Sequence, residues 1–463
     1  MNPLRGRLIA AVELLIGSAT VVAFVVVNYR EGGPWEYRGM ADRVVSGLVP
    51  YREFPFEYPP LALFQIVTPR LLAPGSNEGY DVLFVGMSLA LTLATAAALT
   101  WLAARGWSSV SVSGTQLAFF CLVLAALPQV FWRFDIMPAC FTLLAVVAVA
   151  ANRPAWSGFA LGLGAAAKLY PAVLLPVLLA FYVFSGRRRS AALALFGFLA
   201  IVVSTAAMLF VLAGEDGFTF LTYQAERGLE IESVLAGIVL LAHNLIGAEA
   251  VITFEFGSVQ VESPLIETLS LPNQLALLAL GVALAISLLA SFRADSRRRA
   301  DGSVGGQTLI RYIVASLLLA MIANKVLSPQ YVAWLIPFGA LLPRRQSLVL
   351  VVICALTTLI YPLFFATLRD FNDWTISLLN VRNALLLVLF MWLVIPRRSR
   401  AGEGQSVAML EKPPSRPAPT PNISSPMASR RLCGAITVIR SAAKATVTTL
   451  ASVSPGRPSS AAR

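Results

Sequence analysis

The chain has 463 residues, of which 57% are hydrophobic and 13% charged, and its formal net charge is +12. Apolar runs long enough to cross a bilayer recur along it, so the composition excludes a soluble globular domain and predicts an all-α, polytopic membrane protein. The positive charge does not indicate a nucleic-acid-binding protein. Residues 397–463 carry eleven Lys and Arg against two Asp and Glu, which places nine of the twelve net charges in one C-terminal stretch.

The first apolar run, residues 8–27, follows Arg5 and Arg7 and has no small-residue cleavage site, so we interpret it as a retained signal anchor. Arginines that lie between the later apolar runs belong in cytoplasmic loops. With every such cluster placed there, the chain crosses the membrane twelve times with both termini in the cytoplasm. The expected spans are 8–27, 81–103, 112–130, 136–151, 156–168, 170–185, 190–213, 272–292, 309–324, 329–343, 347–365 and 376–395.

Several of these spans are shorter than a straight crossing requires, so about 11–13 helices are expected and residues 156–185 are expected to form one broken element. Residues 59–73 are interpreted as a helix that dips into the outer face, because one more span would invert the side of every later loop. The remainder, 396–463, is rich in Pro, Ser, Ala and Arg and has no sustained apolar period. We expect a membrane module at 1–395 and a disordered, basic cytoplasmic tail at 396–463 that contacts anionic lipid.

On this path the polar and aromatic segments all emerge on the extracytoplasmic side. They are residues 28–60, 131–135, 168–171, 215–271, 324–331 and 368–374. Their convergence predicts one outward-facing cavity at the outer leaflet. The segment 215–271 carries nine Asp and Glu and a single cation, Arg227, which calls for an anionic partner.

Ionisable residues at membrane depth are costly and tend to face protein or water, which makes them candidates for function. Each also has a plainer interpretation. Arg133 and Asp135 can neutralise each other at a helix start, and Lys168, in the run GLGAAAKLYPAVLLP, can extend to the interface. Glu232 can complement a helix N-terminus instead of binding a ligand.

The segment YREFPFEYPP, residues 51–60, combines charge with aromatic rings and prolines. Its prolines and rings are expected to stiffen a loop at the membrane interface. Glu57 is expected to point into the cavity, with pairing to Arg52 as the alternative. Four tryptophans near predicted interfaces are typical of an aromatic belt: Trp35, Trp132, Trp334 and Trp374.

The sequence contains no Walker loop, no GxGxxG after a strand and no HExxH, which excludes the usual nucleotide-driven and zinc-dependent mechanisms. The four cysteines form no CxxC pair, so no cofactor is firmly implied, although the carboxylates of 215–271 leave a divalent cation open. Carboxylates beside an isolated Arg and Lys favour transfer from a lipid-phosphate donor. The cations would hold the phosphate and a carboxylate would accept the proton of an acceptor hydroxyl.

Five blocks carry a resemblance to a known family. The run GLVPYREFPFEYPPLAL resembles the pattern G-x-V-P-Y-R-D-F-x-x-E-Y-P-P of actinobacterial polyprenyl-phosphate-dependent glycosyltransferases of the GT-C superfamily, close to glycosyltransferase family 87, the α-mannosyltransferase group. RFDIMPA, AAKLYPAVLLP, YQAERGLEIESVLAGIVLLAH and KVLSPQYVAWLIP are similar to further blocks of the same proteins, in the same order. The likeness spans roughly residues 8–395.

The resemblance implies a GT-C fold with an outward-facing active site, a polyprenyl-phosphate sugar as donor and an acidic residue of the first outer loop as base. The position where relatives carry that Asp is Gly33 here, and Glu36 is the nearest candidate to replace it. The expected catalytic residues are Glu36 and Glu57, and the expected phosphate ligands are Arg227, Lys168 and Arg133. The expected substrate contacts are Tyr58, Asp135, Tyr170, Glu232, Gln330 and Tyr331.

The expected function is therefore transfer of a hexosyl group, mannosyl by resemblance, from a polyprenyl-phosphate sugar to an envelope glycolipid or glycan at the outer face of the plasma membrane. Two alternatives of other classes stay open. One is a flippase for a lipid-linked sugar, which would need polar residues through the whole membrane depth. The other is a catalytically inactive lipid-sugar-binding protein, which the Gly33 departure keeps open.

Overall fold

The computed structural model describes residues 34–395. The predicted signal anchor at 8–27, Gly33 and the predicted disordered tail at 396–463 lie outside the described residues. The described residues all belong to one compact unit. The predicted boundary between module and tail stays a prediction.

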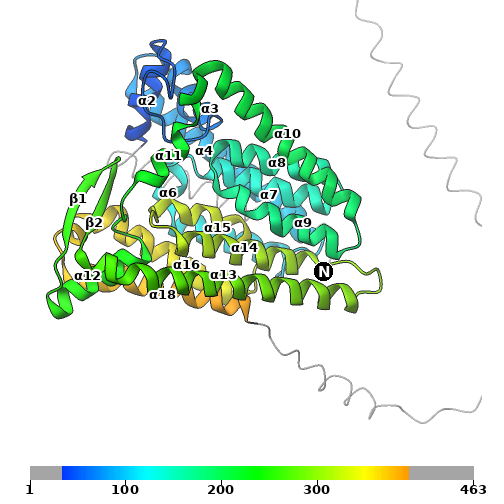
Figure 1. The fold of residues 1–463 in the computed structure, drawn as a ribbon. Helices are drawn as coiled ribbons and strands as arrows, with labels where there is room; N and C mark the ends of the chain where they lie inside the picture. The colour runs from blue at the N-terminus through cyan, green and yellow to red at the C-terminus, as the bar shows by residue number, and fades with distance from the viewer. Residues whose placement is uncertain (1–33, 396–463) are drawn as a thin grey trace, which may run out of the picture. The chain divides into compact units, whose positions relative to one another are not determined.

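Within residues 34–395, six helical stretches are long and apolar enough to cross a membrane. They are built on α4 (Asn77–Ala104), α10 (Arg188–Ala213), α13 (Pro264–Arg298), α14 (Gly306–Ala323), α16 (Arg344–Thr358) and α18 (Asp373–Val394). The helices α13, α14 and α18 pack against one another and lie side by side (Figure 1). The protein is thus a polytopic helical membrane bundle, as the composition predicts.

Shorter helices complete the described bundle. They are α2 (Trp35–Val45), α3 (Ala62–Leu72), α5 (Val112–Ala125), α6 (Leu127–Phe131), α7 (Ile136–Ala150), α8 (Pro154–Ala167), η2 (Tyr170–Leu174), α9 (Leu175–Phe184), η3 (Gly214–Phe218), α11 (Thr219–Glu226), α12 (Val234–Ile246), η4 (Pro329–Tyr331), α15 (Val332–Gly339), η5 (Leu359–Leu363) and α17 (Phe365–Arg369). The spans predicted after residue 80 fall on single long or short helices, or on short helices that follow one another in the chain. The predicted break within 156–185 occurs where α8 stops and Lys168 takes an extended conformation.

The segment 215–271 is more ordered than the long loop expected from its polarity. It contains α11, α12 and an antiparallel hairpin of β1 (Val251–Glu255) and β2 (Ser258–Glu262), whose register pairs Val251 with Glu262 and Glu255 with Ser258. The segment also includes the first eight residues of α13. Ser263 caps this helix by accepting a hydrogen bond from the Leu265 N–H. The apolar side chains of β2 pack with α12 and α18 in one cluster, which holds the hairpin on the bundle.

Two glycines allow α8 and α10 to cross at close range, and α8 packs on its other side against α7 (Figure 1). A Cβ at Gly158 would lie 1.7 Å from the Ala194 carbonyl oxygen, and one at Gly197 would lie 2.2 Å from the Ala155 carbonyl oxygen. Both contacts are to backbone, so neither can be relieved by turning a side chain. Small residues that let helix backbones approach are typical of packing within membranes.

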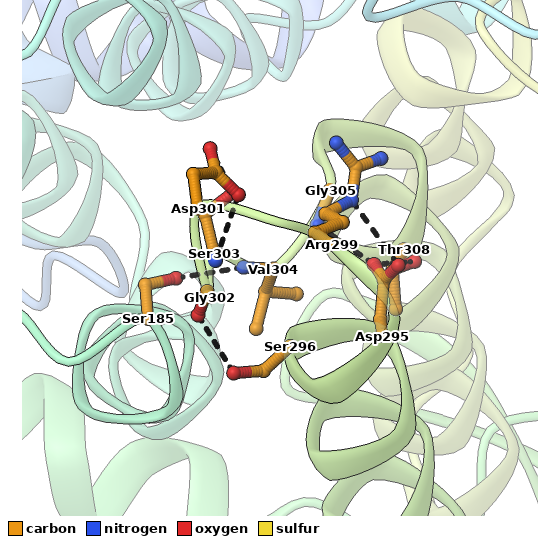
Figure 2. A network of polar contacts seen from close by, with 10 residues as sticks. All are labelled: Ser185, Asp295, Ser296, Arg299, Asp301, Gly302, Ser303, Val304, Gly305 and Thr308. Carbon is orange, nitrogen blue, oxygen red and sulfur yellow. Dashed lines mark hydrogen bonds and ion pairs between the residues drawn. The ribbon is translucent and has the colours of Figure 1, made fainter.

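A polar network closes the loop between α13 and α14, as Figure 2 shows. The Asp295 carboxylate accepts hydrogen bonds from the Gly305 N–H and the Thr308 hydroxyl, each at 2.7 Å, and from the Arg299 Nε at 3.2 Å. Asp295 at the end of α13 therefore satisfies donors at the start of α14, where Gly305 provides no side-chain cap. The network fixes where α14 begins.

Replacing Asp295 with alanine is expected to lower the unfolding free energy by about 1.5–3 kcal/mol, because hydrogen bonds to a charged group are lost and two donors stay unpaired. Thermal unfolding of the purified protein in detergent measures the change. Asp301→Ala is the matched control, since Asp301 is exposed and bonds only locally to Ser303. Equal losses in the two variants would contradict a role for Asp295 in joining the helices.

Candidate functional site

The segment YREFPFEYPP forms a tightly closed loop before α3. The Tyr51 N–H donates to the Phe54 carbonyl at 2.9 Å, and the Tyr51 hydroxyl donates to the Tyr58 carbonyl at 2.7 Å. Tyr51 has a φ of +71°, which is uncommon for a residue with a side chain and is sustained here by these bonds. The rings of Tyr51 and Phe56 are buried in one apolar cluster, so the loop holds Glu57 and Tyr58 in fixed positions.

A cavity of about 490 Å³ lies beside this loop, and residues from four distant parts of the chain line it. They are Glu57, Tyr58, Pro59, Lys168, Leu169, Tyr170, Val173, Arg227, Ala320, Ala323, Asn324, Ser328, Gln330, Tyr331 and Trp334. Seven of the eleven residues predicted for a site are among them. Tertiary contacts therefore bring together the loop of residues 51–60, the break after α8, the end of α11 and the SPQY turn at residues 328–331.

Lys168 lines this cavity at the point where α8 ends and the chain becomes extended. Its Nζ forms an ion pair with Asp135 Oδ1 at 2.7 Å, and the same oxygen accepts a hydrogen bond from Trp334 Nε1 at 2.7 Å. Asp135 is fully buried, and its two contacts hold the side chains of Lys168 and Trp334 in place. The side chain of Lys168 therefore does not extend to the membrane interface.

Aromatic rings enclose the Lys168 ammonium group. The Nζ lies between 5.1 and 5.7 Å from the ring centres of Tyr58, Phe134, Tyr331 and Trp334. Trp334 is stacked between Tyr170 and Tyr331, with ring centres 4.0 Å apart on both sides. The aromatic-belt interpretation is wrong for Trp334, because its ring is buried and its N–H is bonded inside the protein. The rings shield the ammonium group from water and keep its position fixed.

Arg227, at the end of α11, supplies the second cation of the cavity. Its Nη1 lies 3.8 Å from Glu57 Oε2, which is close for an ion pair but too long for a hydrogen bond. Arg52, the alternative partner considered for Glu57, lies instead beside Glu53 at 4.0 Å. Burial raises the pKa of Glu57 above its ordinary value, while the Tyr58 hydrogen bond and the charges of Arg227 and Lys168 act against the rise.

Glu36 and Arg133 form a separate group. Arg133 Nη2 donates to Glu36 Oε1 at 3.0 Å and to the Tyr361 hydroxyl at 2.9 Å, so Arg133 does not neutralise Asp135. Neither Glu36 nor Arg133 lines the cavity. Tyr37 links the two groups, because it follows Glu36 in the chain and its ring packs against Tyr58 and Phe134 beside Lys168.

Comparison with known proteins identifies the family. Residues 56–323, more than half of the chain, match the model of Glycosyltransferase family 87. The chain belongs to glycosyltransferase family 87. No curated protein matches it. The matched region begins one residue before Glu57 and ends where α14 reaches the cavity, so it contains Glu57, Lys168 and Arg227.

This membrane glycosyltransferase therefore uses a sugar donor and an acceptor. The part of the cavity formed by Asn324, Ser328, Gln330, Tyr331 and Trp334 lies beyond the matched residues. No group of three or more His, Cys, Asp or Glu side chains with metal-binding geometry occurs within residues 34–395. A divalent cation bound by the carboxylates of 215–271 stays a prediction.

Glu232, one of the predicted substrate contacts, is not among the residues that line the cavity. It is buried and forms an ion pair with Arg382 of α18 at 3.0 Å, while its neighbour Ser233 provides the cap of α12. Burial raises the pKa of Glu232 to about 8, against the opposing charge of Arg382. The pair joins the segment 215–271 of this glycosyltransferase to α18.

The Glu232 carboxyl makes stability depend on pH. Because its pKa is higher in the folded than in the unfolded protein, its contribution is full below about pH 4.5 and is lost as the pH rises through about 8. The Tm of the wild-type protein is expected to be lower at pH 9 than at pH 5, and Glu232→Gln should reduce this difference. Glu267→Gln, on an exposed position of α13, is the control. An unchanged pH dependence in Glu232→Gln would contradict the effect.

Four residues of this region were not singled out from the sequence. The sequence places Trp334 in an aromatic belt and gives no role to Arg382, although it is an arginine within a predicted span. Glu230 and Ser328 lie in two of the family-like blocks, which by themselves assign no role to either residue. The Glu230 carboxylate accepts a hydrogen bond from the Ser328 hydroxyl at 2.9 Å and holds the SPQY turn against the cavity. Arg382 could have been identified from the sequence, because a charged residue within a membrane span is costly and tends to have a function, which is also how Lys168 was selected.

Proposed function

We propose that this glycosyltransferase transfers a hexosyl group, specifically mannosyl, from a polyprenyl-phosphate sugar to a glycolipid or glycan of the cell envelope at the extracytoplasmic face. The observation that carries the proposal is a cationic cavity that opens into an apolar groove. The cavity matches the anionic end of such a donor and the groove matches its hydrocarbon chain.

The charged residues that line the cavity are Lys168, Arg227 and Glu57, and the Asp135 carboxylate behind the lining pairs with Lys168. Arg227 offers a planar fork of donors that suits phosphate oxygens, and Lys168 supplies a point charge in surroundings from which aromatic rings exclude water. The Arg227 Nε is buried and has no hydrogen-bond partner among the described residues. A donor phosphate would supply the acceptor that this group lacks.

The apolar groove measures about 490 Å³ and runs between η2, α9, α13 and α14. It is lined by Val173, Pro176, Val177, Ala180, Gly281, Leu284, Ala285, Leu288, Leu289, Ser316, Leu319, Ala320 and Ala323. Val173, Ala320 and Ala323 also line the cavity, so the two spaces are contiguous. A polyprenyl chain in this groove would place its phosphate near Lys168 and Arg227. Since lipid tails are as apolar as the groove, packing and not transfer from water would favour this position.

In the proposed reaction, the acceptor oxygen forms a bond to the anomeric carbon while the bond from that carbon to the phosphate oxygen breaks. The electron pair leaves with the polyprenyl phosphate, whose charge Lys168 and Arg227 stabilise. The proton of the acceptor hydroxyl passes to a carboxylate. Glu57 is the better placed base because it lines the cavity, and Glu36, held by Arg133, is the second candidate.

The positions of the arginines support an extracytoplasmic site. The cavity lies at the C-terminal end of α14, at Ala323 and Asn324, whereas the arginine-bearing loop around Arg299 lies at its N-terminal end. The 18 residues of α14 are about 27 Å long, which is close to the thickness of a bilayer core. Arginines in the cytoplasm would therefore put the cavity at the outer face.

Reconstitution in proteoliposomes tests the proposal. Polyprenyl-phosphate mannose is supplied with a panel of glycolipid acceptors, and transfer of radiolabelled mannose is measured together with donor binding. Transfer that needs both substrates is expected. Donor binding without transfer to any acceptor would contradict a transferase and favour a lipid-sugar-binding protein, and movement of the donor across the vesicle without transfer would favour a flippase.

A further inference from the structure

A second cavity, of about 420 Å³, lies on the other side of the YREFPFEYPP loop. One wall is the loop itself, from Tyr51 to Phe56, and the opposite wall is α11. The residues of α11 that line it are Thr219, Thr222, Tyr223 and Glu226. No role proposed above uses this space.

The two cavities adjoin at one place. Phe56 and Glu226 line the second cavity, and the residues that follow them in the chain, Glu57 and Arg227, line the first. The ion pair between Glu57 and Arg227, at 3.8 Å, therefore stands on the boundary between them. A molecule that fills the second cavity would therefore lie next to the proposed base.

The helix α11 is fixed on both sides of this cavity. Phe220 is buried and its ring lies 5.9 Å from that of Tyr51 in the loop, and Tyr223 packs edge-on against Phe256 of the hairpin turn at 5.4 Å. The walls are thus held by packing between three segments. A cavity with such walls is present before any ligand arrives, which reduces the entropy lost on binding.

The charges of the two cavities differ in sign. The first has two cations and one carboxylate, whereas the second has one cation, Arg52, and two carboxylates, Glu53 and Glu226. The second lining therefore disfavours a phosphate and other anions. Carboxylates, threonine hydroxyls and a tyrosine together offer hydrogen-bond partners and a ring face to a polyol.

We infer that the second cavity binds the uncharged sugar of the acceptor and presents one of its hydroxyls to Glu57. This inference rests on the proposed function and extends it by giving donor and acceptor separate cavities on either side of one loop. Glu226 and Thr222 hydrogen-bond the acceptor sugar, and Tyr223 packs against its ring.

Steady-state kinetics tests the assignment. Glu226→Gln and Thr222→Val are expected to raise KM for the acceptor at least about ten-fold while KM for the donor stays unchanged, because each removes a hydrogen-bonding group of the second cavity and neither residue lines the first. The Thr222 hydroxyl donates to the Thr219 carbonyl at 2.9 Å, so its oxygen serves the acceptor sugar as a hydrogen-bond acceptor. Leu221→Ala is the control, since Leu221 lies on the same helix but does not line the cavity. A rise in donor KM, or no change in acceptor KM, would overturn the inference.

A binding measurement keeps the test independent of turnover. Saturation-transfer NMR is recorded on the protein in nanodiscs with a panel of methyl glycosides that includes methyl α-mannopyranoside. Transfer to at least one glycoside is expected in wild type and in Arg227→Ala, and its loss is expected in Glu226→Gln. Transfer that survives Glu226→Gln, or none in wild type, would overturn the inference. Absence of donor binding in the wild-type protein would instead contradict the proposed function.

Discussion

Replacing Glu57 with glutamine is expected to lower kcat by about 10²–10⁴-fold, because the acceptor hydroxyl then lacks the group that takes its proton. Glutamine keeps the size of the side chain and its contact with Arg227, so donor binding should persist. Transfer of radiolabelled mannose in proteoliposomes, with donor binding measured in parallel, separates the two effects. Glu267→Gln removes an exposed carboxylate on α13 and is the control for the chemical change.

The same substitution should alter the pH profile. Burial raises the pKa of Glu57 above 4.5, against the Tyr58 hydrogen bond and the charges of Arg227 and Lys168, while Glu36 adds to the rise. Since a base acts only when unprotonated, kcat/KM for the acceptor should fall as the pH drops through this raised pKa, and Glu57→Gln should lose this acid limb. If Glu57→Gln keeps the kcat and acid limb of wild type while Glu36→Gln loses them, the proton is taken by Glu36.

Replacing Lys168 with methionine is expected to weaken donor binding by at least about 100-fold, because the phosphate loses a charge-assisted contact in a site shielded from water. The substitution also leaves the fully buried Asp135 carboxylate without its ion-pair partner. It is therefore expected to lower the unfolding free energy by about 3–5 kcal/mol. Lost binding in this variant alone would therefore be ambiguous.

The double variant Asp135→Asn, Lys168→Met removes both charges and resolves the ambiguity. Asparagine keeps an oxygen that accepts the hydrogen bond of Trp334, so most of the lost stability should return while donor binding stays weak. Thermal unfolding in detergent and equilibrium binding of polyprenyl-phosphate mannose measure the two effects. A double variant that is stable and binds the donor with wild-type affinity would show that Lys168 does not contribute to donor binding.

Much of the bundle could be predicted from hydropathy and arginine placement. The span expected at 309–324 is α14, and the break expected near Lys168 is where α8 ends. The segment 215–271 was predicted less well. Its hairpin and α11 are short and polar, and they are ordered through contacts such as Phe220 with Tyr51 that join residues far apart in the chain. Local patterns do not contain such contacts.

The sequence by itself determined the class of the protein, the order of its spans and the few charged residues that required an explanation. It did so because burying a charge in a bilayer is costly wherever the charge lies in the chain. Only the tertiary structure decided the partners, pairing Lys168 with Asp135, Arg133 with Glu36 and Arg382 with Glu232. It also placed Glu57 beside Arg227 at the boundary of two cavities. The strength of an ion pair depends on distance and solvent exposure, and both are properties of the folded chain.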